Sequence, residues 1–187
     1  MTEASLKNEN LIKALKEGRI AVMPTDTIYG IVGRAEDEST VSRIYRLRKR
    51  NPEKPCIILI SETSDLENFS VFISPEQEKE IQKYWPGPVS IVLPCKEDKL
   101  KYLHRGTNTL AFRMPAPISL RDLIKETGSL IAPSANPEGL APSETIMEAQ
   151  NYFGNSVDLY VDGGEVHGKP SKVIKLHSDS SVTILRE

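Results

Sequence analysis

The 187-residue sequence has few of the residues that form disulfides or metal centres. Its two cysteines, Cys56 and Cys95, lack C-x-x-C spacing and lie in separate apolar runs, which predicts reduced, buried thiols. Its three histidines, His104, His167 and His177, lie too far apart to form a metal-binding pair on one helix or strand, and we expect them at the surface. The sequence therefore predicts neither a disulfide framework nor a metal site.

Long apolar runs and a dominant charge of one sign are also missing. No run approaches the roughly 20 apolar residues of a membrane-spanning helix, and residues 1–19 lack the apolar core of a signal peptide. These absences favour a cytoplasmic protein with no membrane segment. The formal net charge of −2 excludes neither an anionic nor a cationic ligand, so charge must be examined locally.

What the sequence does contain is an alternation of short strands and helices. The continuously apolar run at residues 56–61 is typical of a strand that is buried on both faces of a sheet. Residues 19–24 and 28–33 are two strand-forming runs that flank a turn rich in hydroxyl groups. Further strands are expected at residues 88–95, 109–115, 129–136, 157–164, 171–177 and 181–187. Because strands and helices alternate, we predict the α/β or α+β class.

Helices are predicted where apolar residues recur with helical spacing. Residues 10–17 end at a glycine cap, and residues 74–85 begin with a capping box and a proline at the first helical position. Residues 38–50 combine an apolar face with a basic one. Two more helices are expected at residues 119–127 and 143–153. The polar stretch 95–108 is predicted to be a long, mobile loop, and residues 1–187, which contain no linker or repeat, are expected to form one domain.

One segment partly matches a phosphate-binding loop. In GGEVHGKPS, Gly163, Gly168 and Lys169 have P-loop spacing and follow an apolar strand. A P-loop needs Ser or Thr after the lysine and a helix whose amides point at the phosphate, whereas here Pro170 follows and the next residues favour a strand. A flexible loop is therefore the better interpretation. The sequence also lacks a G-x-S-x-G elbow, so it offers no candidate for covalent catalysis.

Cationic and hydroxyl groups near strand ends are the remaining candidates for a site. Residues 46–54 carry a cluster of Lys and Arg that is either a solvated helix end or a ligand site. Arg113 directly follows an apolar run, so we expect it at the end of a buried strand, where α/β sheets commonly bind ligands. Ser134 and Asn136 lie two residues apart, so in an extended segment both side chains point the same way.

Six motifs in the chain resemble, in their order and approximate spacing, those of the YrdC/Sua5/TsaC family, the threonylcarbamoyl-adenylate synthases. They are PTDTIYG (24–30), RKRNPEKP (48–55), WPGPVSIVLP (85–94), LAFRMP (110–115), APSANPEG (132–139) and DGG followed by PSKVI (162–174). The ordered set extends over roughly residues 8–187 and is specific, although one motif alone would be weak. The resemblance implies the short, single-domain form of the family, with a twisted mixed β-sheet flanked by helices around a deep, positively charged cavity.

The resemblance also implies an enzyme that joins L-threonine, bicarbonate and ATP, assisted by Mg2+, into threonylcarbamoyl-AMP with release of pyrophosphate. The product serves N6-threonylcarbamoylation of adenosine 37 in tRNA (t6A), which implies a TsaD/Kae1-type transferase and accessory proteins as downstream partners. Because a carbamate is already a nucleophile, this reaction needs cations that hold two anions in line more than it needs a side-chain base. The sequence has no aspartate cluster for the metal, so the triphosphate is expected to supply most of its ligands.

Individual residues match functional positions of the family. The nucleotide-binding and catalytic set falls on Arg48, Arg50, Ser134 and Asn136. Other positions expected near ATP fall on Lys54, Thr109, Ser143 and Arg186. Positions around threonine and its carboxylate fall on Thr25, Arg113 and Ser171. Arg48 replaces the lysine that is usual in the family, and the two cations are not interchangeable at a crowded phosphate site. Asp26 receives no role.

Two other functions stay open. The first is a module that binds double-stranded RNA or tRNA through phosphate contacts, against which stand the slightly acidic composition and the lack of aromatics interleaved with the basic cluster. The second is a related carbamoyl-adenylating activity, as in the YrdC-like domain of hydrogenase maturation proteins, which uses carbamoyl phosphate. Those proteins carry zinc-finger-like motifs and an acylphosphatase portion that this chain lacks.

Overall fold

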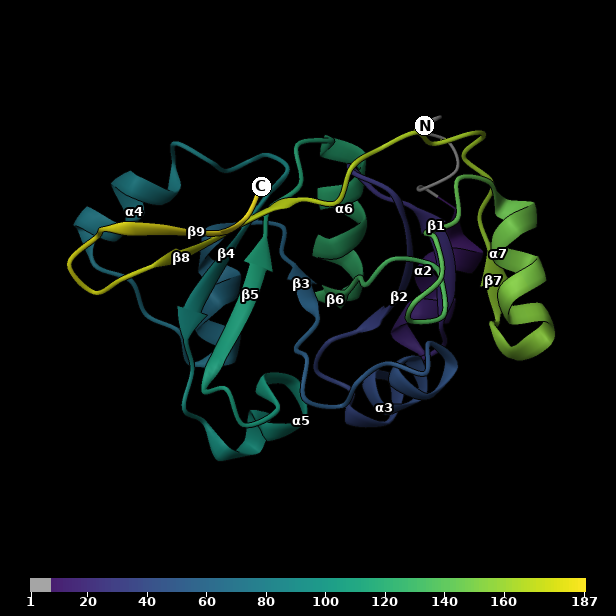
Figure 1. The fold of residues 1–187 in the computed structure, drawn as a ribbon, viewed down its shortest axis with the longest axis horizontal. Helices are drawn as coiled ribbons and strands as arrows, with labels where there is room; N and C mark the ends of the chain where they lie inside the picture. The colour runs from purple at the N-terminus through teal and green to yellow at the C-terminus, as the bar shows by residue number, and fades with distance from the viewer. Residues whose placement is uncertain (1–7) are drawn as a thin grey trace.

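Short strands from the whole length of the chain join into one mixed sheet in the computed structural model, which describes residues 8–187 (Figure 1). The strands are β1 (Ala21–Pro24), β2 (Tyr29–Arg34), β3 (Ile57–Leu59), β4 (Val89–Pro94), β5 (Thr109–Arg113), β6 (Leu130–Ile131), β7 (Leu159–Tyr160), β8 (Lys172–Leu176) and β9 (Val182–Arg186). Within the described residues they lie in the order β7-β1-β2-β6-β3-β5-β4-β8-β9. The predicted class, a mixed sheet with helices, is confirmed.

The strand pairing places the most apolar strand in the middle of the sheet. β3 is parallel to β5 on one side and antiparallel to β6 on the other, and its residues Ile58 and Leu59 are fully buried. β1 and β2 form an antiparallel hairpin in which Pro24 faces Tyr29. The turn at residues 25–28 therefore stands at one end of these two strands.

Helices cover both faces of the sheet (Figure 1). They are α2 (Glu9–Lys16), α3 (Glu38–Leu47), α4 (Pro75–Ile81), α5 (Lys101–His104), α6 (Ile118–Thr127) and α7 (Ile146–Phe153), with 3-10 turns η1 (Thr63–Phe69), η2 (Asp98–Leu100) and η3 (Gly154–Ser156). Met23 and Leu59 pack with α2 and α6 in one apolar layer, whereas their neighbours Val22 and Ile58 pack with α3 in the other. This alternation explains the continuous apolar runs. In the described chain no helix combines the length and apolarity needed to cross a bilayer.

Local signals explain where several helices begin and how closely they pack. The predicted capping box is confirmed at α4, where the Ser74 hydroxyl accepts from the Gln77 amide at 3.2 Å and the Gln77 side chain accepts from the Ser74 amide at 3.0 Å. α3 lies against β2 at Gly33, where an added Cβ would stand 2.4 Å from a methyl group of Thr40. Glycine is therefore required at this position for the close approach of α3.

Two predicted helices end earlier than their sequence patterns indicated, and a third, expected over 143–153, begins only at Ile146. The helix expected over 38–50 ends at Leu47, because Arg48 caps it and Lys49 turns into the left-handed region with φ 49°. The helix expected over 74–85 ends at Ile81. Trp85 precedes Pro86, a position that disfavours helical geometry. The basic residues after Leu47 thus lie on an irregular loop and not on a helix face.

The predictions for residues 95–108 need a larger correction. This stretch is not one long loop, because it contains η2 and α5, whose residues Leu100, Leu103 and His104 are buried. Their i, i+3, i+4 spacing puts them on one helical face. The expectation that His104 lies at the surface is therefore wrong: its side chain is enclosed, and its Nδ1 accepts a hydrogen bond from the Gly106 amide at 3.1 Å.

Candidate functional site

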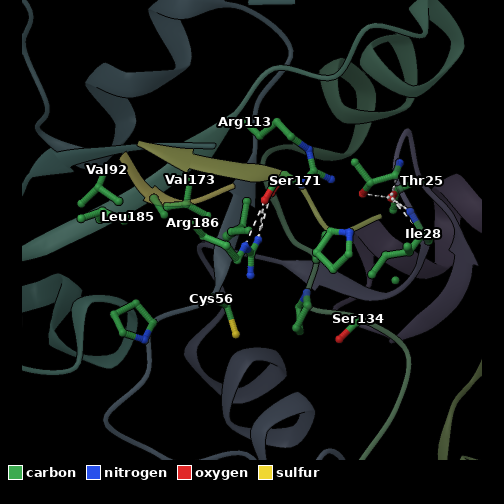
Figure 2. A pocket seen from close by; sticks show the side chains of 18 of the residues that line it. Thr25, Ile28, Cys56, Val92, Arg113, Ser134, Ser171, Val173, Leu185 and Arg186 are labelled. Carbon is green, nitrogen blue, oxygen red and sulfur yellow. Dashed lines mark hydrogen bonds between the residues drawn. The ribbon is translucent and has the colours of Figure 1, made fainter. Parts of the chain in front are cut away.

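A cavity of about 390 Å3 opens beside the β1–β2 turn and extends over β5, β8 and β9 (Figure 2). Three arginines line it, Arg50, Arg113 and Arg186. Six hydroxyl side chains line it as well, those of Thr25, Thr27, Thr107, Thr109, Ser134 and Ser171. Within the described residues 8–187, the lining contains no carboxylate. This composition suits an anionic, polar ligand.

The hairpin turn presents its hydroxyl groups from a rigid backbone. The Thr25 hydroxyl donates to the Ile28 carbonyl at 2.7 Å and accepts from the Thr27 amide at 3.3 Å. The Tyr29 hydroxyl donates to the Gly164 carbonyl at 2.8 Å and accepts from the Gly163 amide at 2.9 Å. The turn is therefore closed by its own hydrogen bonds and joined to the segment that crosses over it.

That crossing segment is the one whose glycines resemble a P-loop. At Gly168 an added Cβ would lie 1.5 Å from the Thr27 carbonyl oxygen, so the backbone of this segment rests directly on the turn. No helix follows the segment; instead β8 begins at Lys172. The prediction that it is not a P-loop is confirmed. Its glycine has a different purpose, because only a residue without a side chain permits this contact.

Arg113, at the end of β5, forms a buried ion pair with Asp26 of the turn. The distance from Arg113 Nη2 to Asp26 Oδ1 is 2.9 Å, and the two side chains are only 3% and 4% exposed. Burial raises the pKa of Asp26 above its usual value and lowers that of Arg113, while the opposite charge of each partner opposes the shift. In Figure 2 the Arg113 side chain extends toward the turn that carries Thr25. The pair thus connects the hairpin to a strand on the opposite side of β6 and β3.

Ser171 and Arg186 form a second polar group in the cavity wall. Arg186 donates from Nη2 to the Ser171 carbonyl at 2.7 Å and from Nε to the same oxygen at 3.1 Å (Figure 2). The Ser171 hydroxyl lies 2.8 Å from the hydroxyl of Ser90 on β4. These bonds tie the start of β8 to β4 and to β9, and they leave the arginine charge without an acidic partner among the described residues.

Arg48 and Arg50 lie two residues apart and have different environments. Arg48 is 3% exposed and donates from Nε to the Asn136 carbonyl at 2.9 Å and from Nη2 to the Ser134 hydroxyl at 3.1 Å. Arg50 is part-exposed and donates to the carbonyls of Lys54 and Pro55 at 3.1 and 2.9 Å. Arg48 therefore joins the motif at residues 48–55 to the motif at residues 132–139. Arg50 brings a positive charge to the cavity.

Lys54 and Glu138 form a more exposed contact between the same two motifs. The Lys54 ammonium lies 3.0 Å from Glu138 Oε1, and the other carboxylate oxygen accepts from the Asn51 amide. The Glu138 amide donates to the Arg48 carbonyl at 2.7 Å. Lys54 is exposed and does not line the cavity. The basic corner, residues 48–54, is thus bonded to residues 134–138 along its whole length.

The structure brings seven of the predicted site residues to the cavity and leaves four outside it. Those that line it are Thr25, Arg50, Thr109, Arg113, Ser134, Ser171 and Arg186. Those that do not are Arg48, Lys54, Asn136 and Ser143. The side-chain oxygens of Ser134 and Asn136 both meet the Arg48 guanidinium, although the segment is bent and not extended as the prediction assumed, because the Asn136 amide donates to the Ser134 carbonyl at 2.9 Å. The Ser143 hydroxyl donates to the Ala135 carbonyl at 2.6 Å and so supports the loop from behind.

Some residues of the site were not found by sequence reasoning. Asp26 and Glu138 were given no role, although an Asp between two threonines in a turn beside a strand-end arginine is a signal for a counter-ion. Cys56 lines the cavity but is 4% exposed, and burial raises the pKa of its thiol, which keeps it protonated. Both cysteines are free and buried, as predicted.

A group of side chains that could ligate a metal lies outside the cavity. Glu144, Glu165 and His167 gather at the surface, with His167 Nδ1 3.0 Å from Glu144 and Nε2 3.0 Å from Glu165. All three are exposed, and each imidazole nitrogen already faces a carboxylate. The His167 ring therefore lies between two exposed carboxylates, and neither of its nitrogens points to open space.

Comparisons with known proteins agree with this geometry. A family model for Sua5, YciO and YrdC, described as telomere recombination, matches residues 13–187. The threonylcarbamoyl-AMP synthase of Pyrococcus abyssi is 35% identical over 165 residues, which cover 87% of this chain and 48% of that protein. The enzyme of the same name from Idiomarina loihiensis is 32% identical over 167 residues, covering 86% of this chain and 88% of that one.

A solved structure matches the fold over the whole chain. The crystal structure of Pyrococcus abyssi Sua5 complexed with L-threonine superposes with a TM-score of 0.86 at 32% identity, covering 100% of this chain and 54% of that one. This chain spans about half the length of the Pyrococcus abyssi and Bacillus subtilis relatives, 48% and 50%. The match of the family model over nearly all of the described residues, together with the relatives above 30% identity, shows that the chain belongs to the Sua5/YciO/YrdC family.

Proposed function

We propose that this chain is a threonylcarbamoyl-AMP synthase, which condenses L-threonine, bicarbonate and ATP and releases pyrophosphate. The observation that carries the proposal is the lining of the cavity, where three arginines and six hydroxyl groups meet without a carboxylate in the described residues. Such a lining suits two anionic substrates held close together. The names of the relatives, and the L-threonine in the Pyrococcus abyssi Sua5 complex, support the choice of substrates.

We propose that the two substrates bind to different arginines of the cavity. Arg113 would bind the carboxylate of threonine, with the hydroxyls of Thr25 and Ser171 beside it. Arg50 and Arg186 would bind phosphate oxygens. Guanidinium groups suit both tasks because their planar donors match carboxylate and phosphate oxygens in pairs.

The chemistry that remains for the protein is mainly electrostatic. The threonine amine captures CO2 derived from bicarbonate, and the resulting carbamate oxygen attacks the α-phosphorus as the bond to pyrophosphate breaks. Fixed cations offset the repulsion between carbamate and triphosphate and stabilise the negative charge that builds on the leaving group. The protonated Cys56 is a poor nucleophile, so direct attack by the carbamate accounts for the reaction without a covalent enzyme intermediate.

Mg2+ would enter the site with ATP as part of the nucleotide substrate. The lining residues include no carboxylate in the described chain, so phosphate oxygens would be its main ligands. The chain's own contribution is to hold the triphosphate with Arg50, Arg186 and Ser134.

The product determines what must act next. A carbamic–phosphoric anhydride is labile in water, so we propose that a TsaD/Kae1-type transferase with its accessory proteins consumes it to form t6A in tRNA. We do not assign a direct contact with tRNA to this chain; the RNA-binding measurement below tests for it. The two free cysteines fit a reducing compartment such as the cytoplasm, where ATP and tRNA are available.

The proposal is tested by ATP-dependent release of pyrophosphate from purified protein with Mg2+, omitting L-threonine or bicarbonate in turn. We expect release only with all substrates present. Arg50→Ala should lower kcat/KM by about 100-fold or more, the scale for loss of one transition-state cation or donor. Arg46→Ala removes the same charge from an exposed position on α3 and is the matched control.

The results separate the alternatives. Release that needs all substrates, falls in the Arg50 variant and persists in the Arg46 variant supports the synthase. Release with carbamoyl phosphate in place of threonine and bicarbonate would point to the related carbamoyl-adenylating activity. No release, with salt-sensitive RNA binding that ignores ATP, would replace the proposal by an RNA-binding function.

A further inference from the structure

The three arginines of the cavity differ in what neutralises them. Arg113 has a carboxylate partner, Asp26, at 2.9 Å, and that pair is almost fully buried. Arg50 donates only to backbone carbonyls, and Arg186 donates to the carbonyl and hydroxyl of Ser171. Among the described residues no acidic side chain forms an ion pair with either of them. The Arg113 guanidinium is therefore neutralised by a carboxylate, whereas those of Arg50 and Arg186 are not, although Arg186 lies near enough to Arg113 to lower its pKa.

This difference affects which anions each guanidinium group can accept. A simple polyanion placed at Arg113 meets the buried negative charge of Asp26 as well as the guanidinium, and in a site of low dielectric that repulsion is costly. A zwitterionic amino acid, the form of threonine before its amine takes up CO2, meets no such penalty on binding, because its own ammonium group balances the additional carboxylate. Pyrophosphate and triphosphate are favoured at Arg50 and Arg186, where the guanidinium charge is available.

Asp26 can act in this way without touching a ligand. Both of its carboxylate oxygens are enclosed, and it does not belong to the cavity lining. Its neighbours Thr25 and Thr27 do line the cavity, and the closed turn that they form holds the carboxylate in place. Asp26 thus acts through Arg113, by fixing the direction of the guanidinium and by setting the local net charge.

We infer that Asp26 is a positioning and specificity-determining residue that reserves the Arg113 guanidinium for the carboxylate of an amino acid and excludes phosphate chains from it. This inference rests on the proposed function for the identity of the amino acid, L-threonine. The neutralisation of Arg113 by Asp26 does not involve threonine, so it can be examined with inorganic pyrophosphate even where threonine is absent.

Titration calorimetry on the nucleotide-free protein tests the inference. The wild-type chain should bind about one pyrophosphate, and saturating pyrophosphate should leave its affinity for L-threonine unchanged. Asp26→Asn keeps the shape of the side chain and removes its charge. This variant should bind a second pyrophosphate, and pyrophosphate should then weaken threonine binding by about tenfold or more through competition at Arg113.

A matched control removes an ion pair elsewhere. Asp158 lies 2.6 Å from Arg43 in a partly exposed pair outside the cavity, so Asp158→Asn removes one carboxylate charge from an ion pair that meets neither ligand and should leave both ligands bound as in the wild type. A general loss of stability would affect both variants. Only a change of selectivity in the Asp26 variant supports the inference, because a merely structural role would not create a second pyrophosphate site.

Other measurements keep the inference testable if Asp26→Asn does not fold. In the Asp26-containing chain, Arg50→Gln should lower pyrophosphate affinity by about tenfold or more, since the neutralised Arg113 cannot replace it. Pyrophosphate that displaces threonine from the wild type, or a folded Asp26 variant with unchanged selectivity, would overturn the inference. Absence of threonine binding in the wild type would contradict the proposed function instead. The number of pyrophosphate molecules bound by the wild type and by Asp26→Asn would still show whether Asp26 keeps phosphate from Arg113.

Discussion

The two ends of the cavity hold their charges in opposite ways. At the hairpin end, Asp26 and Arg113 are buried together, and neither charge can be removed without leaving the other unpaired. At the basic corner, Arg50 is held by neutral carbonyl groups, and the ion pair between Lys54 and Glu138 faces solvent. The comparison shows that ion-pair geometry alone does not measure importance, because two pairs of nearly equal length differ in burial and so in energetic consequence.

The largest effect is expected from breaking the buried pair. Arg113→Gln leaves the Asp26 carboxylate in an enclosed position without its cation, and removal of one partner of a buried pair costs about 3–5 kcal/mol. Urea unfolding monitored by circular dichroism should show this loss as a lower midpoint at unchanged slope.

A double-mutant cycle identifies the source of that loss. Adding Asp26→Asn to Arg113→Gln removes the stranded charge, so the double variant should recover most of the stability lost in Arg113→Gln. If the stability losses of the two single variants simply add, the ion pair is not the cause of the loss. The buried pair of Asp26 and Arg113 would then behave like the exposed pair of Lys54 and Glu138.

The pH dependence of the Arg113 variant sharpens the same point. Burial already raises the pKa of Asp26, and loss of the facing guanidinium raises it further. A carboxyl whose pKa is higher when folded stabilises the protein fully below its unfolded value, about 3.9. That contribution is lost as pH rises through the folded value. The stability deficit of Arg113→Gln relative to the parent should therefore shrink as pH falls from about 7 to about 5.

The control for this measurement is internal. The pKa of Asp158 is lowered, because the ion pair with Arg43 and the Ile20 amide outweigh the effect of burial. Its contribution to stability is lost as pH falls, but equally in parent and variant, so it cancels in the difference. A deficit that stays constant between the two pH values would show that Asp26 does not titrate as proposed.

Arg48 and Ser134 show how much of this arrangement the sequence could predict. The order of the motifs predicted the family, and apolar runs such as residues 56–61 predicted the central strand β3. The spacing of Ser134 and Asn136 predicted parallel side chains only for an extended segment; the segment is bent, and the two side chains meet because both bind the same guanidinium. Sequence could not show that the common partner of these two residues is Arg48, because the partners lie 86 and 88 residues apart and meet only through the sheet.

Burial was the property that sequence reasoning judged least well. The cluster at residues 46–54 was considered as one group of charges, yet Arg48 is enclosed and Lys54 is exposed. Residues 95–108 were judged by polarity, yet Leu100 and Leu103 anchor them to the core. In both cases the decisive fact is which neighbour packs against the segment, and a local pattern does not contain that information.

Arg48→Lys is expected to have an intermediate effect. Lysine keeps the charge but cannot reproduce the Nε and Nη2 bonds to the Asn136 carbonyl and the Ser134 hydroxyl, so stability should fall by about 1–3 kcal/mol. Arg50→Lys should leave stability nearly unchanged and instead raise the KM for ATP. The pair of variants, compared by thermal unfolding and by steady-state kinetics, separates the arginine that holds the corner together from the one that faces the ligand; equal losses of stability would contradict that division.

The smallest effect is expected for the exposed pair at the corner. Lys54 is 60% exposed and Glu138 29% exposed, so solvent screens their attraction even though the nitrogen and oxygen lie only 3.0 Å apart. A double-mutant cycle with Lys54→Met and Glu138→Gln should give a coupling close to zero that does not change with salt. The single Glu138→Gln variant should alter only the KM for ATP, and by a few-fold at most, because the Glu138 backbone amide still donates to the Arg48 carbonyl at 2.7 Å. A coupling as large as that of Asp26 with Arg113 would mean that the corner is held by charge after all, and that the contrast between the two ends lies in their ligands alone.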